Sequence, residues 1–176
     1  MKNKQNKKIN TKGFTLLELL VVILIIGILA AIATPQYKMS VGRTQFTMVK
    51  NFTKNIVESL QRYYLVNNAY PSRYTQLDIS FDGIKGTYSD SQQFSFSVAG
   101  GISCSVWFSQ TGRFVSCSRE IFGKTISYYV YRDTNKPYIC RVKGIDPSNM
   151  ANRLCQIETG RKKGTCENGG CYYGYR

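Results

Sequence analysis

The sequence contains no histidine, and this absence excludes several common kinds of functional site. Catalysis by an imidazole base, zinc binding by cysteine together with histidine, and pH switching by histidine are all ruled out. Acidic residues are also scarce, with 10 Asp and Glu against 24 Lys and Arg, so the formal net charge is +14. Such a balance is typical of a solvated basic surface, and it also favours nucleic acid, anionic lipid or acidic polysaccharide as a partner.

Cysteine is missing from the first 103 residues, and six cysteines follow in the second half of the chain. An even number confined to one region predicts disulfides formed in an oxidising compartment. The late acidic residues are scattered, whereas calcium needs several converging oxygen ligands, so no metal site is expected. The sequence shows neither a nucleophile paired with a base nor a phosphate-binding loop, so we expect no enzyme and no cofactor.

A long apolar run lies near the N-terminus, from Phe14 to Ala33, and Glu18 is its only charged residue. As a helix these twenty residues would span about 30 Å, the thickness of a bilayer's hydrocarbon core. An unpaired carboxylate there would cost about 2.5 kcal/mol or more, which predicts a functional residue with a partner. Five lysines precede the run and predict a cytoplasmic N-terminus: Lys2, Lys4, Lys7, Lys8 and Lys12.

The helical pattern continues beyond Pro35, so we expect one helix from about Thr15 to Val66. Its second half is amphipathic, and we expect its apolar stripe to pack on a sheet. The stripe consists of Tyr37, Val41, Met48, Phe52, Ile56, Leu60 and Tyr63. Proline removes a backbone donor at Pro35, which predicts a kink there.

Several strand signals follow the helix. They lie at residues 94–98, 102–108, 113–119 and 124–132, with a short edge piece at 138–142. Pairing Phe108 with Arg113 across the turn at 109–112 puts Cys104 opposite Cys117, which predicts a disulfide between them. Proximity then favours Cys140–Cys155 and Cys166–Cys171, although four cysteines allow three connectivities.

The C-terminal region combines a short helix with basic and aromatic residues. We expect a helix over Met150–Ile157, capped by Ser148 or Asn149. A basic run and the final arginine could contact nucleic acid or another polyanion, while packing on the sheet is the simpler role for the neighbouring tyrosines. These basic residues are Arg161, Lys162, Lys163 and Arg176.

The N-terminal stretch closely resembles the type IV pilins and the type II secretion pseudopilins. The matching residues are Lys12 and Gly13 before the cut, Phe14 after it, Glu18, and Pro35 at the end of the span. The resemblance implies cleavage between Gly13 and Phe14 by a membrane prepilin peptidase, and then N-methylation of Phe14. It also implies that Glu18 pairs with the amine of Phe14 on a neighbouring subunit, which would set the register between subunits.

The resemblance also implies an architecture and a set of partners. The fold class is α+β, with a long N-terminal helix on an antiparallel sheet of about four strands and a disulfide-tied C-terminal region. A leader (1–13) is removed, which lowers the net charge to +9. A membrane helix (14–35) and an amphipathic half (36–66) then lead into a globular head (67–176), which comprises a loop (67–93), the sheet (94–142) and the disulfide region (143–176).

The implied function is that of a type IV pilus subunit. It would be held in the bacterial inner membrane, with its head outside the cytoplasm, and assembled by a membrane platform into a filament of like subunits and other pilins. One alternative is a type II secretion pseudopilin in a periplasmic pseudopilus. The other is a secreted disulfide-rich binding module, cut after Ala33 by ordinary signal peptidase so that it begins at Thr34. Adhesion, motility and DNA uptake stay open as roles for a pilus.

Overall fold

The computed structural model describes residues 13–90, 93–109, 112–131 and 138–174 of the chain. Its longest element is the helix α1 (Leu16–Asn67), which matches the predicted single helix to within one residue at each end. The chain divides into an N-terminal unit that ends at Lys38 and a second unit that begins at Met39. The second unit contains the rest of α1 together with all the strands, so it holds the hydrophobic core.

The second unit is built on one antiparallel sheet of eight strands in the order β1-β2-β3-β4-β5-β6-β8-β7. The pilin-like α+β architecture is confirmed, but the expected count of about four strands is too low. The strands are β1 (Lys85–Ser89), β2 (Gln93–Val98), β3 (Ile102–Ser109), β4 (Gly112–Ile121), β5 (Lys124–Tyr131), β6 (Ile139–Lys143), β7 (Thr165–Glu167) and β8 (Gly170–Gly174).

Three of these strands lie where no strand was expected: β1 in the predicted loop (67–93), and β7 and β8 in the disulfide region (143–176). β1 is short and its register with β2 shifts between Lys85 and Tyr88, so it lacks a clean alternation. β7 and β8 form a hairpin whose turn is Asn168-Gly169, and both residues have positive φ, as a tight hairpin turn requires. Because β8 pairs with β6, the segment expected as an edge piece at 138–142 lies inside the sheet.

The predicted register of the central hairpin is confirmed. β3 and β4 pair Phe108 with Arg113 and Cys104 with Cys117, as the turn position implied. The next connection, between β4 and β5, is a two-residue turn at Phe122-Gly123 with φ of 56° and 68°. The pairings of β3 with β4 and of β4 with β5 are continuous, so alternate side chains of these three strands point toward α1.

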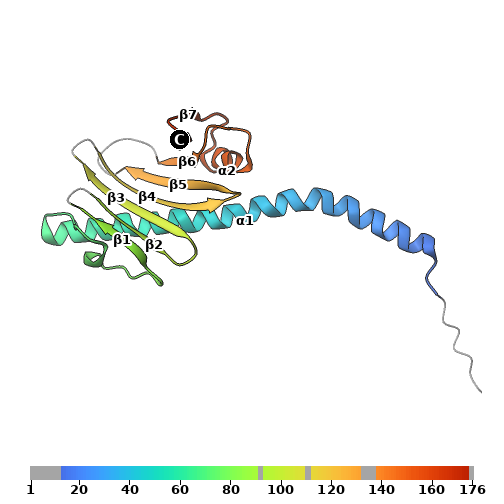
Figure 1. Ribbon diagram of the computed structural model, residues 1–176, viewed down its shortest axis with the longest axis horizontal. Coiled ribbons are helices and arrows are strands. Elements are labelled where there is room, and N and C mark those ends of the chain that lie inside the picture. Colours follow the sequence, from blue (N-terminus) through green and yellow to red (C-terminus); the bar gives the residue numbers. More distant parts are fainter. Residues whose placement is uncertain (1–12, 91–92, 110–111, 132–137, 175–176) are drawn as a thin grey trace, which may run out of the picture. The chain divides into compact units, whose positions relative to one another are not determined.

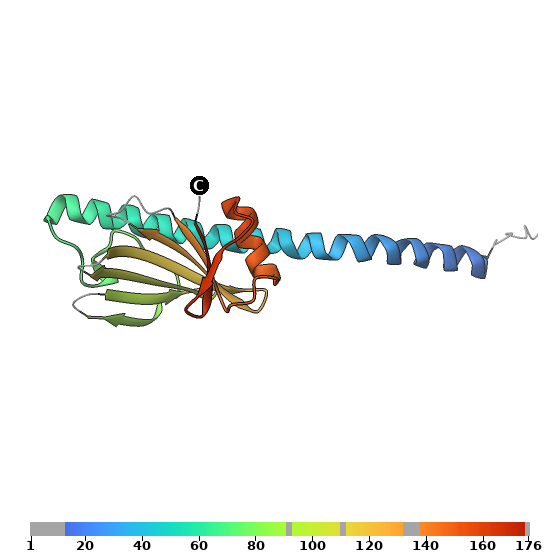
Figure 2. The ribbon, with the colours of Figure 1, turned by 90° about the horizontal axis from the view of Figure 1, so that it is seen from above.

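α1 lies along one face of the sheet, as Figure 1 and Figure 2 show for the second unit. Phe46 of α1 is completely buried and meets the ring of Tyr128 edge-on at 6.2 Å between centroids. The buried positions of α1 recur mostly every three or four residues, so they form one continuous stripe along the helix. They are Gly42, Phe46, Val49, Thr53, Ile56, Ser59 and Leu60.

The buried stripe differs from the predicted one in its N-terminal part. Tyr37, Val41 and Met48 were expected in the core, but they are 71%, 38% and 45% exposed. The prediction was wrong there because two adjoining stripes have the same spacing, and the sheet covers the neighbouring one. Gly42 lies on the covered stripe, where a Cβ atom would overlap the ring of Phe122, so the absence of a side chain allows this contact.

The C-terminal end of α1 is joined to the following loop by polar contacts. Arg62 Nη2 donates to Asp78 Oδ1 at 2.8 Å, and the hydroxyl of Ser59 donates to the same carboxylate oxygen. Hydrogen bonds from Arg62 and Ser59 hold the pKa of Asp78 well below its usual range. Just before Asp78 lies the short 3-10 helix η1 (Tyr74–Gln76), and Leu77 is buried, so this loop is fixed against the helix.

Candidate processing and assembly segment

The start of α1 is capped by its own residues. Thr15 precedes the first helical residue, and its backbone N–H donates to Glu18 Oε2 at 2.8 Å. The Thr15 hydroxyl donates to the same oxygen at 2.9 Å, and the N–H of Glu18 donates back to that hydroxyl at 3.3 Å. This reciprocal arrangement is a capping box, which satisfies otherwise unpaired donors at the helix N-terminus.

The capping box gives Glu18 a partner within its own chain. This capping box was not predicted, although the spacing Thr15-Leu16-Leu17-Glu18 has the signature form Thr-x-x-Glu. The arrangement places the carboxylate at the positive end of the helix dipole, where negative charge is stabilised. The predicted pairing with the amine of a neighbouring subunit therefore competes with an existing set of hydrogen bonds.

The N-terminal unit presents apolar side chains outward. Phe14 is 82% exposed, and the helix is long and apolar enough to cross a membrane, with none of its most apolar window buried. Gly13 and Phe14 precede the helix, in a segment with no regular secondary structure. The expected cut between these two residues therefore falls in non-helical backbone just before α1.

Pro35 lies inside α1, which continues through it. Proline has no N–H to donate to the carbonyl four residues earlier. In the helical turn just before Pro35, the hydroxyl of Thr34 donates a hydrogen bond to the carbonyl of Ala30 at 2.7 Å. Gly27 lies one turn further back with nothing within 4 Å of where a Cβ atom would stand.

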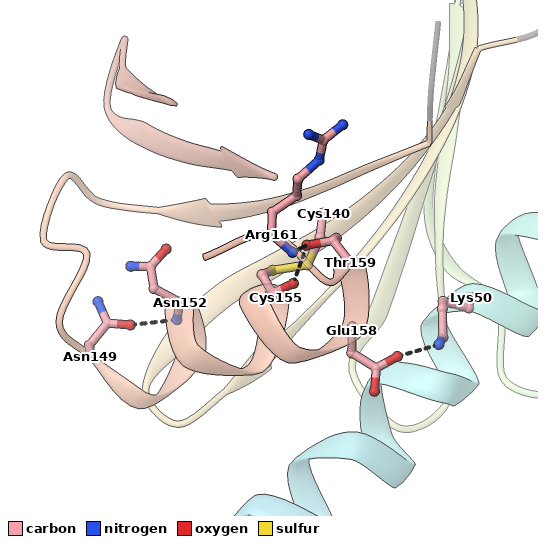
Figure 3. Close-up of a disulfide and its surroundings, with 8 residues drawn as sticks. All are labelled: Lys50, Cys140, Asn149, Asn152, Cys155, Glu158, Thr159 and Arg161. Carbon is pink, nitrogen blue, oxygen red and sulfur yellow. Dashed lines mark hydrogen bonds and ion pairs between the residues drawn. A yellow bond between two sulfur atoms is a disulfide. The ribbon is translucent and has the colours of Figure 1, made fainter. Parts of the chain in front are cut away.

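All six cysteines form disulfides, in the same three pairs as those expected. Cys104 on β3 is bonded to Cys117 on β4, with both side chains completely buried. Cys166 on β7 is bonded to Cys171 on β8 across the last hairpin. The third bond joins Cys140 on β6 to Cys155 on the helix α2 (Met150–Thr159), as Figure 3 shows.

α2 is held from several directions. Asn149 caps its first turn, accepting a hydrogen bond from the N–H of Asn152 at 2.9 Å, so Asn149 rather than Ser148 is the capping residue. At its other end Glu158 pairs with Lys50 of α1 at 2.5 Å, and Figure 3 shows the two side chains pointing toward each other. Together with Cys155, these contacts place α2 on the same face of the sheet as α1.

Three residues of the predicted basic group follow α2 in the chain. Arg161, Lys162 and Lys163 are all exposed. Arg161 Nε donates to the carbonyl of Gly174 at 3.2 Å, which ties the basic run to the end of β8. Arg176 lies outside the described residues. Within the part of the chain that the structure describes, no three Cys, Asp or Glu side chains come together as a metal site would require.

Comparison with known proteins gives matches to the whole N-terminal motif and to part of the head. A family model described as the prokaryotic N-terminal methylation motif matches residues 8–34. A fimbrial protein from Neisseria meningitidis serogroup A is 33% identical over 131 residues, which cover 73% of this chain and 72% of that protein. The major component of the type IV wide pilus of Thermus thermophilus is 37% identical, over 58% of this chain and 82% of its own.

A secretion protein is also similar, over a shorter stretch. The type II secretion system core protein G of Pseudomonas aeruginosa is 42% identical over 66 residues. The match covers 38% of this chain and 46% of that protein. This match, at 66 residues, is no longer than the part of the chain up to the end of α1 at Asn67. The match to the fimbrial protein, at 131 residues, is about twice as long.

Proposed function

This chain belongs to the type IV pilin and type II secretion pseudopilin family, and we propose that it is a pilin, a structural subunit of a type IV pilus. In this proposal it is held in the bacterial inner membrane by the first half of α1, with its N-terminus in the cytoplasm and its head outside. An assembly platform in the membrane then adds it to a helical filament of like subunits and other pilins. We assign no catalytic role to any residue.

The observation that favours a pilin over a pseudopilin is the length of the similarity. A match of 131 residues to a fimbrial protein must include much of the head, because only 67 residues precede the end of α1. The match to the secretion protein, at 66 residues, is short enough to fit within that shared N-terminal part. The head is the part that differs between the two kinds of filament, so its similarity to a fimbrial protein supports the pilus.

The N-terminal residues have a defined order of use in this proposal. A prepilin peptidase cuts between Gly13 and Phe14, and methylation of Phe14 follows on the new amine. That amine is positive and enters the apolar centre of the filament, where an unpaired charge is costly. Glu18 of a neighbouring subunit neutralises it and thereby sets the axial register. To do so Glu18 must give up its bonds to Thr15, so assembly exchanges one set of partners for another.

Pro35 and the disulfides support the remainder of the proposal. The donor missing at Pro35 makes that part of α1 the place where the helix would kink as subunits pack. The three disulfides, at about 2–4 kcal/mol each in favourable cases, would stabilise a head that leaves the cell. The exposed basic run Arg161-Lys162-Lys163, with Arg176, would then face a polyanion outside the cell.

Mass spectrometry of the mature protein from its native cell envelope, without reduction, tests the processing. We expect a chain that begins at methylated Phe14 and is six hydrogens lighter than its reduced form, because it contains three disulfides. A chain that begins at Thr34 would show cleavage by ordinary signal peptidase, and would contradict both the membrane anchor and the role of Glu18.

Imaging distinguishes the two filaments. Antibodies against the head should label filaments on the surface of intact cells, and substitution of Glu18 by Gln should abolish them. Labelling that requires opening the outer membrane, together with loss of protein secretion on deletion, would identify a pseudopilin instead.

A further inference from the structure

The face of the sheet that points away from α1 and α2, here called the outer face, is rich in hydroxyl groups. Strand alternation places there the side chains that neighbour the buried core positions. Ser97 and Ser103 lie opposite each other on β2 and β3 with their hydroxyls 2.9 Å apart. One row of paired residues crosses all eight strands and reads Lys85, Ser97, Ser103, Ser118, Ser127, Arg141, Tyr172 and Thr165.

A group of aromatic rings adjoins this row on the same face. Trp107 and Phe114 are paired on β3 and β4, with ring centroids 5.8 Å apart and planes 18° from parallel. Phe114 also contacts Tyr129 and Tyr131 of β5, at 5.7 and 5.8 Å between centroids. Trp107 is 36% exposed, and because it lies on the outer face it is not stabilised by burial in the hydrophobic core. Rings gathered on an exposed, otherwise polar surface are typical of a binding surface.

Arg141 supplies a positive charge on the outer face, on β6 between Ser127 of β5 and Tyr172 of β8. Its guanidinium lies 5.3 Å from the ring of Tyr172, and its Nε is buried without a hydrogen-bond partner. Space for it is provided by Gly170, where a Cβ atom would come within 2.8 Å of that Nε. Burial acts to lower the pKa of Arg141, but its contacts with the hydroxyls of Tyr129 and Tyr172 outweigh this and raise it, so the group stays charged.

No acidic side chain neutralises this arginine within the described residues. None of the ion pairs Arg43–Glu158, Lys50–Glu158 and Arg62–Asp78 includes Arg141, and each involves a helix residue. A guanidinium is a rigid fork of donors that suits a carboxylate. Arg141 contacts two tyrosines and has no acidic partner among the described residues, so it is prepared for a carboxylate that comes from outside the chain.

We propose that the outer face binds an acidic polysaccharide, that is, a chain of sugars bearing carboxylates. Arg141 pairs with a carboxylate, Trp107 and the rings beside it stack on the apolar face of a sugar, and the serine hydroxyls exchange hydrogen bonds with sugar hydroxyls. Each group matches a feature of this ligand: hydroxyls both donate and accept, and the electron-rich face of a ring attracts the polarised C–H groups of a sugar.

Nucleic acid fits this face less well. Its affinity comes mainly from many phosphate contacts, which require a dense set of cations. The outer face instead carries two carboxylates by its alternation, Glu120 on β4 and Glu167 on β7, beside the cations Lys85, Arg141 and Lys143. The proposal concerns the head alone and goes beyond filament assembly, so it can be tested on the unassembled subunit.

The experiment uses the full chain in detergent micelles, titrated with polygalacturonate, and the fluorescence of its single tryptophan, Trp107, is the direct readout. We expect a saturable change in that fluorescence. Arg141→Gln should weaken binding about tenfold, the typical effect of a lost charge-assisted hydrogen bond. The matched control is Lys54→Gln, which removes the same charge from an exposed residue of α1, on the opposite side of the sheet, and should leave the affinity unchanged.

A second variant keeps Arg141 and its packing intact. Ser103→Asp places a carboxylate at an exposed position in the hydroxyl row, and should weaken polygalacturonate binding by about tenfold or more through like-charge repulsion. Unchanged thermal melting would show that both variants fold. The proposal is overturned if the fluorescence does not respond, if neutral dextran binds equally well, if single-stranded DNA binds more tightly, or if Ser103→Asp and Lys54→Gln have equal effects.

Discussion

The two halves of α1 have the same secondary structure and opposite surroundings. Residues 16–38 carry large apolar side chains that are mostly more than half exposed, whereas the part after Met39 buries one stripe completely against the sheet. An isolated helix is marginal in water, and most helical stability in proteins comes from packing of an apolar face. The second half therefore finds its packing within the chain, and the first half must find it in lipid or in other subunits.

The contrast can be tested most strongly with one large-to-small substitution in each half. Phe46→Ala removes a completely buried ring that contacts Tyr128, and we expect a loss of about 3–5 kcal/mol in the free energy of unfolding of the head. Leu24→Ala, at a position 58% exposed, should change that free energy by about 0.5 kcal/mol or less. Urea unfolding in micelles measures both, and equal losses would contradict the division.

Glycine provides a second pair, with effects of opposite sign. Gly42→Ala would drive a methyl group into the ring of Phe122, so we expect a destabilisation of about 1–3 kcal/mol in spite of alanine's better helix propensity. Gly27→Ala meets nothing within 4 Å and should stabilise the local helix by up to about 1 kcal/mol. Thermal melting reports the first, and amide exchange around residue 27 reports the second.

The assignment of the clash can be checked with a double-mutant cycle. Phe122→Ala should relieve the overlap, so the cost of Gly42→Ala should largely disappear in that background. If Gly42→Ala destabilises the head equally in both backgrounds, the destabilisation does not come from an overlap with Phe122.

The capping box predicts a smaller effect at the start of the exposed half. Thr15→Val removes the hydroxyl that bonds to Glu18, and should destabilise the first helical turn by about 1 kcal/mol. Thr34→Val is the matched control, because it removes a hydroxyl bonded to Ala30 inside the helix. Hydrogen exchange at the amides of residues 16–18 should accelerate only in the first variant, and equal rates in both would argue against a cap.

The smallest effect is expected at the far end of the packed half, where Arg62 meets Asp78. Hydrogen bonds from Arg62 and Ser59 lower the pKa of Asp78 in the folded chain, so its contribution to stability is complete above the ordinary aspartate pKa of about 4. That contribution should be lost as the pH falls further, toward the folded-state pKa.

The measurement is the difference in melting temperature between the wild type and Asp78→Asn as a function of pH. The difference should be constant from pH 7 to about pH 4 and should shrink below it. Asp82→Asn, which removes a charge from an exposed residue of the same loop, should show a smaller difference throughout. A difference in melting temperature that increases below about pH 4 would contradict the lowered pKa of Asp78.

The features that could be predicted from the sequence are those set by neighbours along the chain. The apolar run and its length depend on composition alone, and the register of Cys104 with Cys117 follows from one turn a few residues away. Asn149 and Ser148 were both reasonable caps, and the choice between them depends on a hydrogen bond to Asn152 that spacing does not distinguish.

The features that were missed depend on contacts between distant segments. Lys50 and Glu158 are 108 residues apart, and no local pattern pairs them. Tyr37, Val41 and Met48 have the correct period for a core stripe, but the sheet selects the adjoining stripe because Gly42 admits Phe122. β7 has three residues and becomes a strand only because β8 offers it a partner. Tertiary pairing outweighed weak local preference in each case.

The placement of the disulfides also determines how the subunit would carry a pulling force. The three bonds close loops with sequence separations of 13, 15 and 5, and α1 contains no cysteine. Tension applied along α1 therefore loads no sulfur–sulfur bond. It shears the buried stripe of α1 against the sheet and strains the pairs Lys50–Glu158 and Arg62–Asp78. The subunit would yield first at this contact between layers, while the cross-linked sheet and α2 kept their shape, so a stretched subunit could recover its fold when released.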